Sequence, residues 1–284
     1  MSSQCYNRKT HEVNNSSGQQ RALRFLYHTK PGRFLLWSVA ARPWFNKCVT
    51  VYHKSGLSHK DIAPFVKKHN INIEQEKLRQ YRTFNDFFTR TKTIDNRWKP
   101  NILLSPADSK MQYFPITNDL RLNIKSSNYS LAEILGDKKW AKQFKGGTCI
   151  VFRLCVDDYH RYHYIDNGKV VAHKKIKGEL HTVRPISERY NVYTRNAREV
   201  TLMQMDNLGL VAQIEVGALL VGKIINNPAT QFQAMQEKGH FEFGGSTIVM
   251  LFNKPIIFDE DIVISHQMGY ETQVEAGEPI GLIA

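Results

Sequence analysis

The sequence predicts an α+β protein in which a helical N-terminal layer precedes a core that is mostly an antiparallel β barrel or sandwich. Two observations favour this class. Residues 19 to about 90 carry apolar side chains and capping signals typical of helices, whereas the residues after Pro100 fall into short β-type runs separated by glycine, asparagine and proline. With 284 residues, of which 42% are hydrophobic, the chain can bury a large core.

The first element is a polar N-terminus, residues 1–18, which we expect to be loose. Residues 19–98 follow as a helical region that we expect to associate with a membrane. Its first two apolar segments lie on either side of Pro31-Gly32, a pair that interrupts the helical pattern.

Two capping signals place later helices in this region. Ser58 is positioned to cap a helix that has Asp61 in its first turn. Thr83 is positioned in the same way before Phe84–Phe88. Both residues can accept a hydrogen bond from a backbone N–H group that the first turn of a helix leaves unpaired.

Residues 99–284 are expected to form one β-rich catalytic domain. Its β-type runs have the spacing typical of antiparallel sheets, and they are 149–152, 170–172, 199–203, 210–214, 248–252 and 262–264. One helix interrupts them at residues 130–135, and Gly136 is placed to end it. The turn at 274–281 is similar to that of lipoyl- and biotinyl-type β domains.

The net charge of +13 is concentrated at one end of the chain. Residues 1–100 hold 19 lysines and arginines against 6 acidic residues, whereas the remainder holds 20 of each. Such asymmetry indicates a polyanionic partner, either a nucleic acid or an anionic membrane, although a merely solvated basic face has the same composition. No nucleic-acid-binding module is recognisable, so we expect no nucleic acid and favour the membrane.

The basic residues alternate with apolar and aromatic ones in the first helical segments. No apolar run approaches the ~20 residues that span a bilayer. The pattern instead suits helices that lie in the membrane interface, where cations meet anionic headgroups. The side chains assigned to this contact are Arg21, Arg24, Arg33, Phe34, Leu35, Trp37 and Arg42. A helical hairpin that simply packs on the domain is the alternative.

Other common sites are not suggested by the sequence. The four cysteines form no CxxC pair and no secretory signal peptide precedes them, which favours a reduced intracellular setting. No glycine-rich phosphate loop or dinucleotide fingerprint is visible. No metal site is expected, because His160 and His163 lack further ligands at a metal-site spacing.

Three short segments carry the chemistry: Leu104–Asp108, Asp157–His163 and Phe243–Val249. Each alone is ordinary, since Gly-Gly-Ser-Thr is typical of a turn and an aspartate after Pro-Ala is typical of an Asx turn. Together they supply an acid, a base and a serine in that chain order. A serine hydroxyl becomes a nucleophile when a histidine takes its proton and a carboxylate orients that histidine.

The three segments resemble those of the phosphatidylserine decarboxylase family, bacterial type, whose members carry Ser-Pro-Ala-Asp, Asp-Tyr-His-Arg-x-His and Gly-Ser-Thr motifs. Thr83–Arg90 is similar to the Phe-Asn-x-Phe-Phe-x-Arg signature of that family, and Tyr6–Thr10 to the start of some bacterial members. Three positions depart from the family pattern. Ser109 replaces a glycine, 234–236 replaces a Lys-Gly-Glu-like stretch, and Gly244-Gly245 replaces Leu-Gly.

The resemblance implies that the protein cuts itself. Asp108 would orient His163, and His163 would activate Ser246 to attack the carbonyl of Gly245. Cleavage between residues 245 and 246 would yield a β chain, residues 1–245, paired with an α chain, residues 246–284. The new N-terminus of the α chain would be a pyruvoyl group made from Ser246, and this group is the implied cofactor.

The implied reaction is the decarboxylation of phosphatidylserine to phosphatidylethanolamine and CO2, through a Schiff base with the pyruvoyl group. His160 or His163 would return the proton. The predicted location is the cytoplasmic face of the cell membrane, as a peripheral protein. Two alternatives are a pyruvoyl-dependent decarboxylase of a soluble amino acid and an unprocessed lipid-binding pseudoenzyme. The sequence leaves open whether the protein forms a homodimer.

Overall fold

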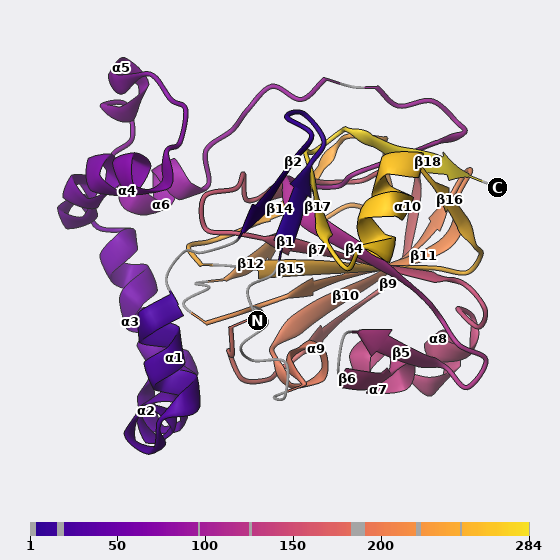
Figure 1. Ribbon diagram of the computed structural model, residues 1–284, viewed down its shortest axis with the longest axis horizontal. Coiled ribbons are helices and arrows are strands. Elements are labelled where there is room, and N and C mark those ends of the chain that lie inside the picture. The colour runs from indigo at the N-terminus through magenta and orange to yellow at the C-terminus, as the bar shows by residue number, and fades with distance from the viewer. Residues whose placement is uncertain are drawn as a thin grey trace.

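The computed structural model describes residues 4–15, 20–95, 97–124, 127–182, 191–219, 223–244 and 246–283. A large sheet forms its centre, and the helices of the N-terminal third stand to one side of it (Figure 1). The strands of this sheet are β1 (Gln4–Asn7), β2 (Glu12–Asn15), β4 (Ser109–Pro115), β7 (Thr148–Leu154), β9 (Gly168–Ile176), β10 (Arg198–Met205), β11 (Gly209–Val216), β13 (Gln231–Phe232), β15 (Ser246–Phe252) and β17 (Glu271–Val274).

The ten strands are ordered β13-β9-β10-β11-β15-β7-β4-β17-β1-β2. All neighbouring pairs among them are antiparallel except β1 with β17. The predicted α+β class with a mostly antiparallel core and a helical N-terminal layer is confirmed. The described strands form open sheets and do not close into a barrel, which corrects one of the two predicted forms.

Three smaller sheets complete the β structure. They contain β12 (Ile224–Asn226), β14 (Glu237–Phe241) and β8 (Arg161–His163); β16 (Ile256–Phe258), β18 (Pro279–Ile283) and β3 (Ile102–Leu104); and β5 (Arg121–Ile124) with β6 (Ser127–Ser130). Side chains of β3, β8 and β18 share one hydrophobic cluster with β7 and β15, so two of these sheets cover one face of the central sheet.

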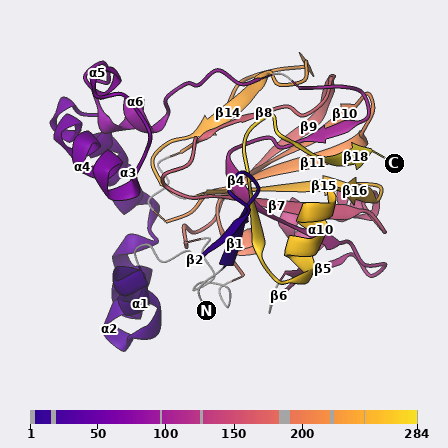
Figure 2. The same ribbon diagram turned by 45° about the horizontal axis from the view of Figure 1, so that its top comes forward.

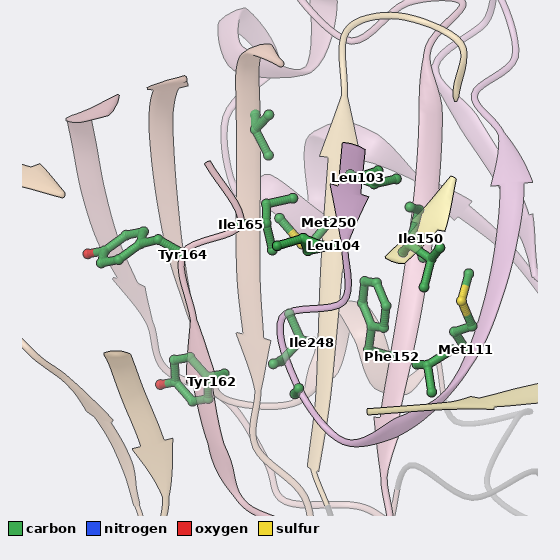
Figure 3. Close-up of a cluster of buried hydrophobic side chains, with 14 of the residues drawn as sticks. Leu103, Leu104, Met111, Ile150, Phe152, Tyr162, Tyr164, Ile165, Ile248 and Met250 are labelled. Atoms are coloured by element: carbon green, nitrogen blue, oxygen red, sulfur yellow. The ribbon is translucent and has the colours of Figure 1, made fainter. Parts of the chain in front are cut away.

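The central strands β7 and β15 are buried along their whole length because both faces of the sheet are covered. Ile248 and Met250 of β15 face the cluster shown in Figure 3, which also holds Leu104 and Phe152. Val249 and Leu251 point the other way, toward α7 (Leu131–Leu135), α8 (Lys138–Lys142) and α9 (Val192–Arg195).

The N-terminal helices are α1 (Gln20–His28), α2 (Lys30–Leu35), α3 (Pro43–His53), α4 (Ile62–His69), α5 (Gln75–Leu78) and α6 (Phe84–Phe88), with a π-helical turn at Leu36–Ala40 and a 3₁₀ turn at Gly56–Asp61. Thr83 caps α6 as predicted, and it forms a reciprocal capping box with Asp86. Gly136, with φ 63°, ends α7 as predicted.

Ser58 does not cap a helix, so this prediction is wrong. It lies buried in the 3₁₀ turn, where its hydroxyl accepts the N–H of Phe84 at 2.9 Å and donates to the carbonyl of Ser55 at 2.7 Å. Ser58 therefore joins two parts of the helical layer. The following helix, α4, begins at Ile62.

The predicted strand at residues 262–264 is also wrong, because these residues lie in α10 (Glu260–Gln267). Glu260 and Asp261 lie in its first turn, where negative charge is favourable to a helix. Ile262 is buried and Ile264 is exposed, so the helix covers the sheet with one side only.

Residues 4–15 form a hairpin, where the sequence predicted a loose terminus. The guanidinium of Arg8 holds the hairpin in place. It forms ion pairs with Asp259, Asp261 and Glu278 at 2.7–3.0 Å. This tertiary contact, together with the parallel pairing of β1 on β17, orders a polar segment that has no core of its own.

Candidate active site

The aspartate of the first motif lies in a tight turn between β3 and β4. Its carboxylate accepts the N–H of Ala276 at 2.8 Å and the ammonium of Lys92 at 2.5 and 2.7 Å. Ser109 starts strand β4 after this turn, and its hydroxyl donates to the carbonyl of Ala107 at 3.3 Å. Ser109 is not among the described residues with a left-handed backbone, so the turn does not need a glycine there.

The histidine segment leaves the end of β7 and returns as β8. Burial raises the pKa of Asp158 to about 6, although its carboxylate accepts the N–H of Cys155 at 2.6 Å. The N–H of His163 donates to the carbonyl of Pro106 at 3.0 Å. This bond brings the second motif against the first.

The imidazole of His163 is buried and lies parallel to the ring of Tyr159, with 6.1 Å between ring centroids. Burial lowers the pKa of His163, and the charge of Lys92 lowers it further, against opposing effects of the Pro106 backbone, Glu237 and Asp108. A lowered pKa keeps the ring neutral at pH 7. His163 can therefore accept a proton, as a general base must.

Asp108 and His163 are neighbours but form no hydrogen bond within the described part of the chain. Both carboxylate oxygens of Asp108 contact Lys92, and Nδ1 of His163 is buried without a partner. Catalytic hydrogen bonds are often unmade before the reacting groups come together. The structure thus supplies both groups of the predicted pair in one place, with Lys92 bonded to the carboxylate.

Ser246 is the first residue of β15 and pairs with Leu154 at the end of β7. It is completely buried, and its hydroxyl has no hydrogen-bond partner among the described residues. Gly244 has φ 132°, a conformation that disfavours residues with a Cβ. Gly245, the predicted partner of Ser246 in cleavage, lies outside the described residues.

His160 lies beside the backbone of Gly244. Its ring is fully buried, sits 4.0 Å from the ring of Phe88, and donates from Nδ1 to the carbonyl of Asp158 at 2.8 Å. Burial lowers the pKa of His160 to about 3, and the backbone of Gly244 is close enough to oppose that shift. Of the two histidines, His160 is thus the one placed next to the approach to Ser246, with Nε2 unpaired.

Comparison with known proteins matches residues 84–282 to the family model described as phosphatidylserine decarboxylase. The chain belongs to the phosphatidylserine decarboxylase family. It is 45% identical over 91% of its length to phosphatidylserine decarboxylase proenzyme 2 of Clostridium acetobutylicum, of which 91% is covered. It is 38% identical to the phosphatidylserine decarboxylase proenzymes of Ruminiclostridium cellulolyticum and Clostridium tetani, over 98% and 97% of this chain and 97% of each relative.

One departure from the phosphatidylserine decarboxylase pattern is visible in the backbone. Met235, which stands where the family pattern has glycine, has φ 62°. A left-handed conformation costs a residue with a side chain about 1–2 kcal/mol. Met235 therefore adopts a backbone conformation that would suit glycine better.

Sequence reasoning missed a buried polar network on the face of the sheet that carries Ser246. Nζ of Lys238 lies 2.8 Å from the carboxylate of Glu215, and both side chains are almost inaccessible to solvent. Asn226 accepts from Lys238 at 2.7 Å and donates to Glu215 at 3.2 Å and Glu199 at 3.0 Å. Lys92, beside Asp108, was missed as well. Single lysines in polar stretches carry no sequence signal that would have distinguished them.

The predicted membrane residues are spread from α1 to the start of α3: Arg21 and Arg24 lie in α1, Arg33, Phe34 and Leu35 in α2, Trp37 in the π-helical turn, and Arg42 directly before α3. Phe34 is 72% exposed and Trp37 is 62% exposed, and Leu35 is also exposed. The guanidinium of Arg42 lies 4.7 Å above the ring of Trp37. The side chain of Arg21 lies outside the described residues, whereas those of Arg24 and Arg33 are exposed. The exposed apolar side chains that the prediction omitted include Phe25, Trp44, Val51 and Leu57.

Among the described residues, none of the helices is both long and apolar enough to cross a membrane.

Proposed function

We propose that this protein is a self-cleaving decarboxylase that converts phosphatidylserine to phosphatidylethanolamine with a pyruvoyl group made from its own Ser246. Membership of the phosphatidylserine decarboxylase family and the proenzyme names of its relatives support the reaction. The assignment of the site depends on one observation, the buried hydroxyl of Ser246, which has no hydrogen-bond partner among the described residues. A buried hydroxyl without a partner costs about 1–3 kcal/mol, and such groups in native proteins call for an explanation such as catalysis.

The first step is a shift of the peptide bond. Ser246 Oγ adds to the carbonyl carbon of Gly245 while its proton passes to His163, the C–N bond then breaks, and the proton is delivered to the nitrogen of residue 246. The product is an ester between Gly245 and the Ser246 side chain. Asp108 stabilises the charged imidazole during this transfer.

The second step releases the two chains. Loss of the Cα proton of residue 246 breaks its Cβ–O bond, so that Gly245 leaves as a carboxylate and residue 246 becomes dehydroalanine. Addition of water with loss of ammonia then leaves the pyruvoyl group. Gly244 suits this chemistry because its φ of 132° lets the segment adopt a backbone that a side chain would resist.

The surroundings of Ser246 fit such a group. The site is buried, His160 lies beside the backbone of Gly244, and no bulky side chain follows Phe243 before Ser246. The pyruvoyl carbonyl supplies an electron sink for decarboxylation. His160 and His163, each with an unpaired ring nitrogen, are the residues assigned to pass on the proton that replaces CO2 on the substrate carbon.

The substrate reaches the site from a membrane surface. Exposed Phe34, Leu35 and Trp37, with Arg24 and Arg33 nearby in the chain, form the apolar and cationic set that suits the interface of an anionic membrane. We place the protein peripherally on the cytoplasmic face of the cell membrane. The helical region 19–98 and the catalytic domain 99–284 are the units in this proposal.

Intact mass spectrometry tests the cleavage directly. The wild-type chain should give two products that end and begin at residues 245 and 246, the second with the mass of a pyruvoyl N-terminus. Ser246→Ala should give one uncleaved chain that releases no CO2 from phosphatidylserine. Two chains from Ser246→Ala would contradict the assignment, and CO2 release from free serine but not from the lipid would favour a soluble substrate.

A further inference from the structure

The segment that leads to the scissile bond packs against the helical layer. The ring centroid of Phe243 lies 4.1 Å from that of His53, 5.1 Å from Phe84 and 5.2 Å from Phe88. Phe243 also belongs to the hydrophobic cluster of the helical layer. Among the described apolar residues of this cluster, Phe243 comes from the catalytic domain, and it lies three positions before Ser246.

A second contact holds the residue next to Phe243. Nζ of Lys54 lies 2.5 Å from a carboxylate oxygen of Glu242, whose side chain is 7% exposed. His53 and Lys54 are consecutive residues at the C-terminal end of α3, so a single helix end supplies both contacts. The N–H of Glu242 donates to the carbonyl of Lys223 at 2.9 Å, which ties the same residue to the β structure.

The sheet fixes the other side of the bond, because Ser246 pairs with Leu154. Only Gly244 and Gly245 lie between Phe243 and Ser246. Glycines restrain the backbone less than any other residue. The position of the Gly245 carbonyl relative to Ser246 Oγ therefore depends on the two anchors, and one of them is the helical layer.

We propose that Phe243 and Lys54 are positioning residues for self-cleavage, through which the helical layer holds the scissile segment against Ser246. The inference rests on the proposed cleavage between residues 245 and 246. In this proposal α3 has two roles. It exposes the apolar side chains of Trp44 and Val51 along its length, and its C-terminal end holds the scissile segment. The helical layer is then part of the machinery that forms the enzyme.

The rate of self-cleavage tests this proposal. The full chain is synthesised in a cell-free system, and timed samples are separated on denaturing gels. Phe243→Ala should slow the appearance of the two chains at least tenfold, because a misplacement of about 1 Å at reacting groups can cost about 100-fold. An unchanged rate would overturn the proposal.

Phe65→Ala is the matched control. Phe65 belongs to the same cluster and lies 5.1 Å from Phe84 and 6.1 Å from Phe87, but it makes no ring contact with Phe243 among the described residues. Its loss should weaken the helical layer and leave the cleavage rate within about twofold of wild type. Equal slowing in Phe65→Ala and Phe243→Ala would show a general loss of stability and would overturn the positioning role.

Lys54 provides an independent variant with a conservative rescue. Lys54→Met should slow cleavage severalfold, and Lys54→Arg, which keeps the charge opposite Glu242, should restore most of the rate. If Lys54→Arg cleaved no faster than Lys54→Met, the ion pair of Lys54 with Glu242 would have no role in positioning the scissile segment.

Hydroxylamine at neutral pH identifies the step that is affected, since it splits an ester but leaves a peptide bond intact. Precursor of Phe243→Ala should resist it, because misplacement prevents the ester from forming. Release of both chains by hydroxylamine would place the defect after the first step and overturn the proposal. A wild-type chain that is not cut between residues 245 and 246 would instead refute the proposed function.

Discussion

The carboxylate of Asp108 has two basic neighbours, Lys92 and His163, and it is bonded to the first. Lys92 also lies 5.0 Å above the ring of Tyr159, against which His163 is stacked. The side chains of Asp108, Lys92, His163 and Tyr159 therefore share one environment. At the scale of single residues, Lys92 both hydrogen-bonds the acid and lowers the pKa of the base.

Lys92→Met should shift the pH dependence of self-cleavage. The substitution removes a charge that lowers the pKa of His163 and leaves Asp108 able to bond the imidazole, so the pKa of His163 should rise. A higher pKa keeps His163 protonated up to a higher pH. As the pH is lowered, the cleavage rate should therefore start to fall at a higher pH in Lys92→Met than in wild type. The measurement is the cleavage half-time between pH 5 and pH 8, with Lys99→Met as a surface control. Superimposable profiles would show that Lys92 does not act on His163.

Asp108→Asn and His163→Ala should both accumulate full-length precursor. Each removes part of the pair that activates Ser246, and losses in such units typically reach about 10⁴-fold. His160→Ala should still cleave but lose turnover on phosphatidylserine, because its unpaired Nε2 lies beside the approach to Ser246, where it can take up a proton and pass it to the substrate carbon. Gel analysis and CO2 release measure the two effects. Normal cleavage in His163→Ala, or unchanged kcat in His160→Ala, would remove that residue from its assigned step.

At the scale of elements, the ion pair of Lys238 with Glu215 joins β14 to β11 beneath the small sheet. Neither charge has access to solvent. A buried carboxylate without its cation is strongly unfavourable, whereas the intact pair adds little net stability. The contact therefore fixes the position of β14 more than it stabilises the fold.

Lys238→Met should lower the free energy of unfolding by about 3–5 kcal/mol, because Glu215 would remain buried and charged. Urea unfolding of the Ser246→Ala chain, which stays in one piece, provides the measurement. The double substitution Lys238→Met with Glu215→Gln should recover part of the loss. A single substitution that costs less than about 1 kcal/mol would mean that water reaches Glu215, because a surface ion pair contributes that little.

At the scale of the whole molecule, positive charge and exposed apolar side chains meet on the N-terminal helices, and these helices stand beside the sheets in both views (Figures 1 and 2). The chain beyond residue 100 has no excess of either sign. We therefore expect an anionic membrane to be attracted to this end of the protein.

Replacement of Arg21, Arg24 and Arg33 by Gln should weaken binding to anionic vesicles by about 1 kcal/mol for each arginine near the surface. Added salt should have the same effect in wild type, since charges are screened within about 10 Å at 0.1 M. Trp37→Ser should weaken binding without changing its salt dependence. Vesicle co-sedimentation measures all three, and salt-independent wild-type binding would show that apolar insertion is the main anchor.

Much of the fold and of the site could be predicted from local sequence. The cap at Thr83, the helix end at Gly136 and the buried runs of β7 and β15 depend on residues within a few positions of one another. The acid, the bases and the serine were assigned from continuous motifs in the same way, and these assignments stay predictions. The match to the phosphatidylserine decarboxylase family over residues 84–282 includes all three motifs.

The predictions were wrong where contacts between residues far apart in the sequence determine the local structure. Arg8 orders the N-terminal hairpin through acids near the other end of the chain, and Ser58 bonds Phe84 in place of its own helix. Only the tertiary structure decided which groups face the reacting residues: Lys92 on Asp108, His160 beside Gly244, and Phe243 among the rings of the helical layer. The physical reason is that capping and periodicity act along the chain, whereas burial and charge act through space.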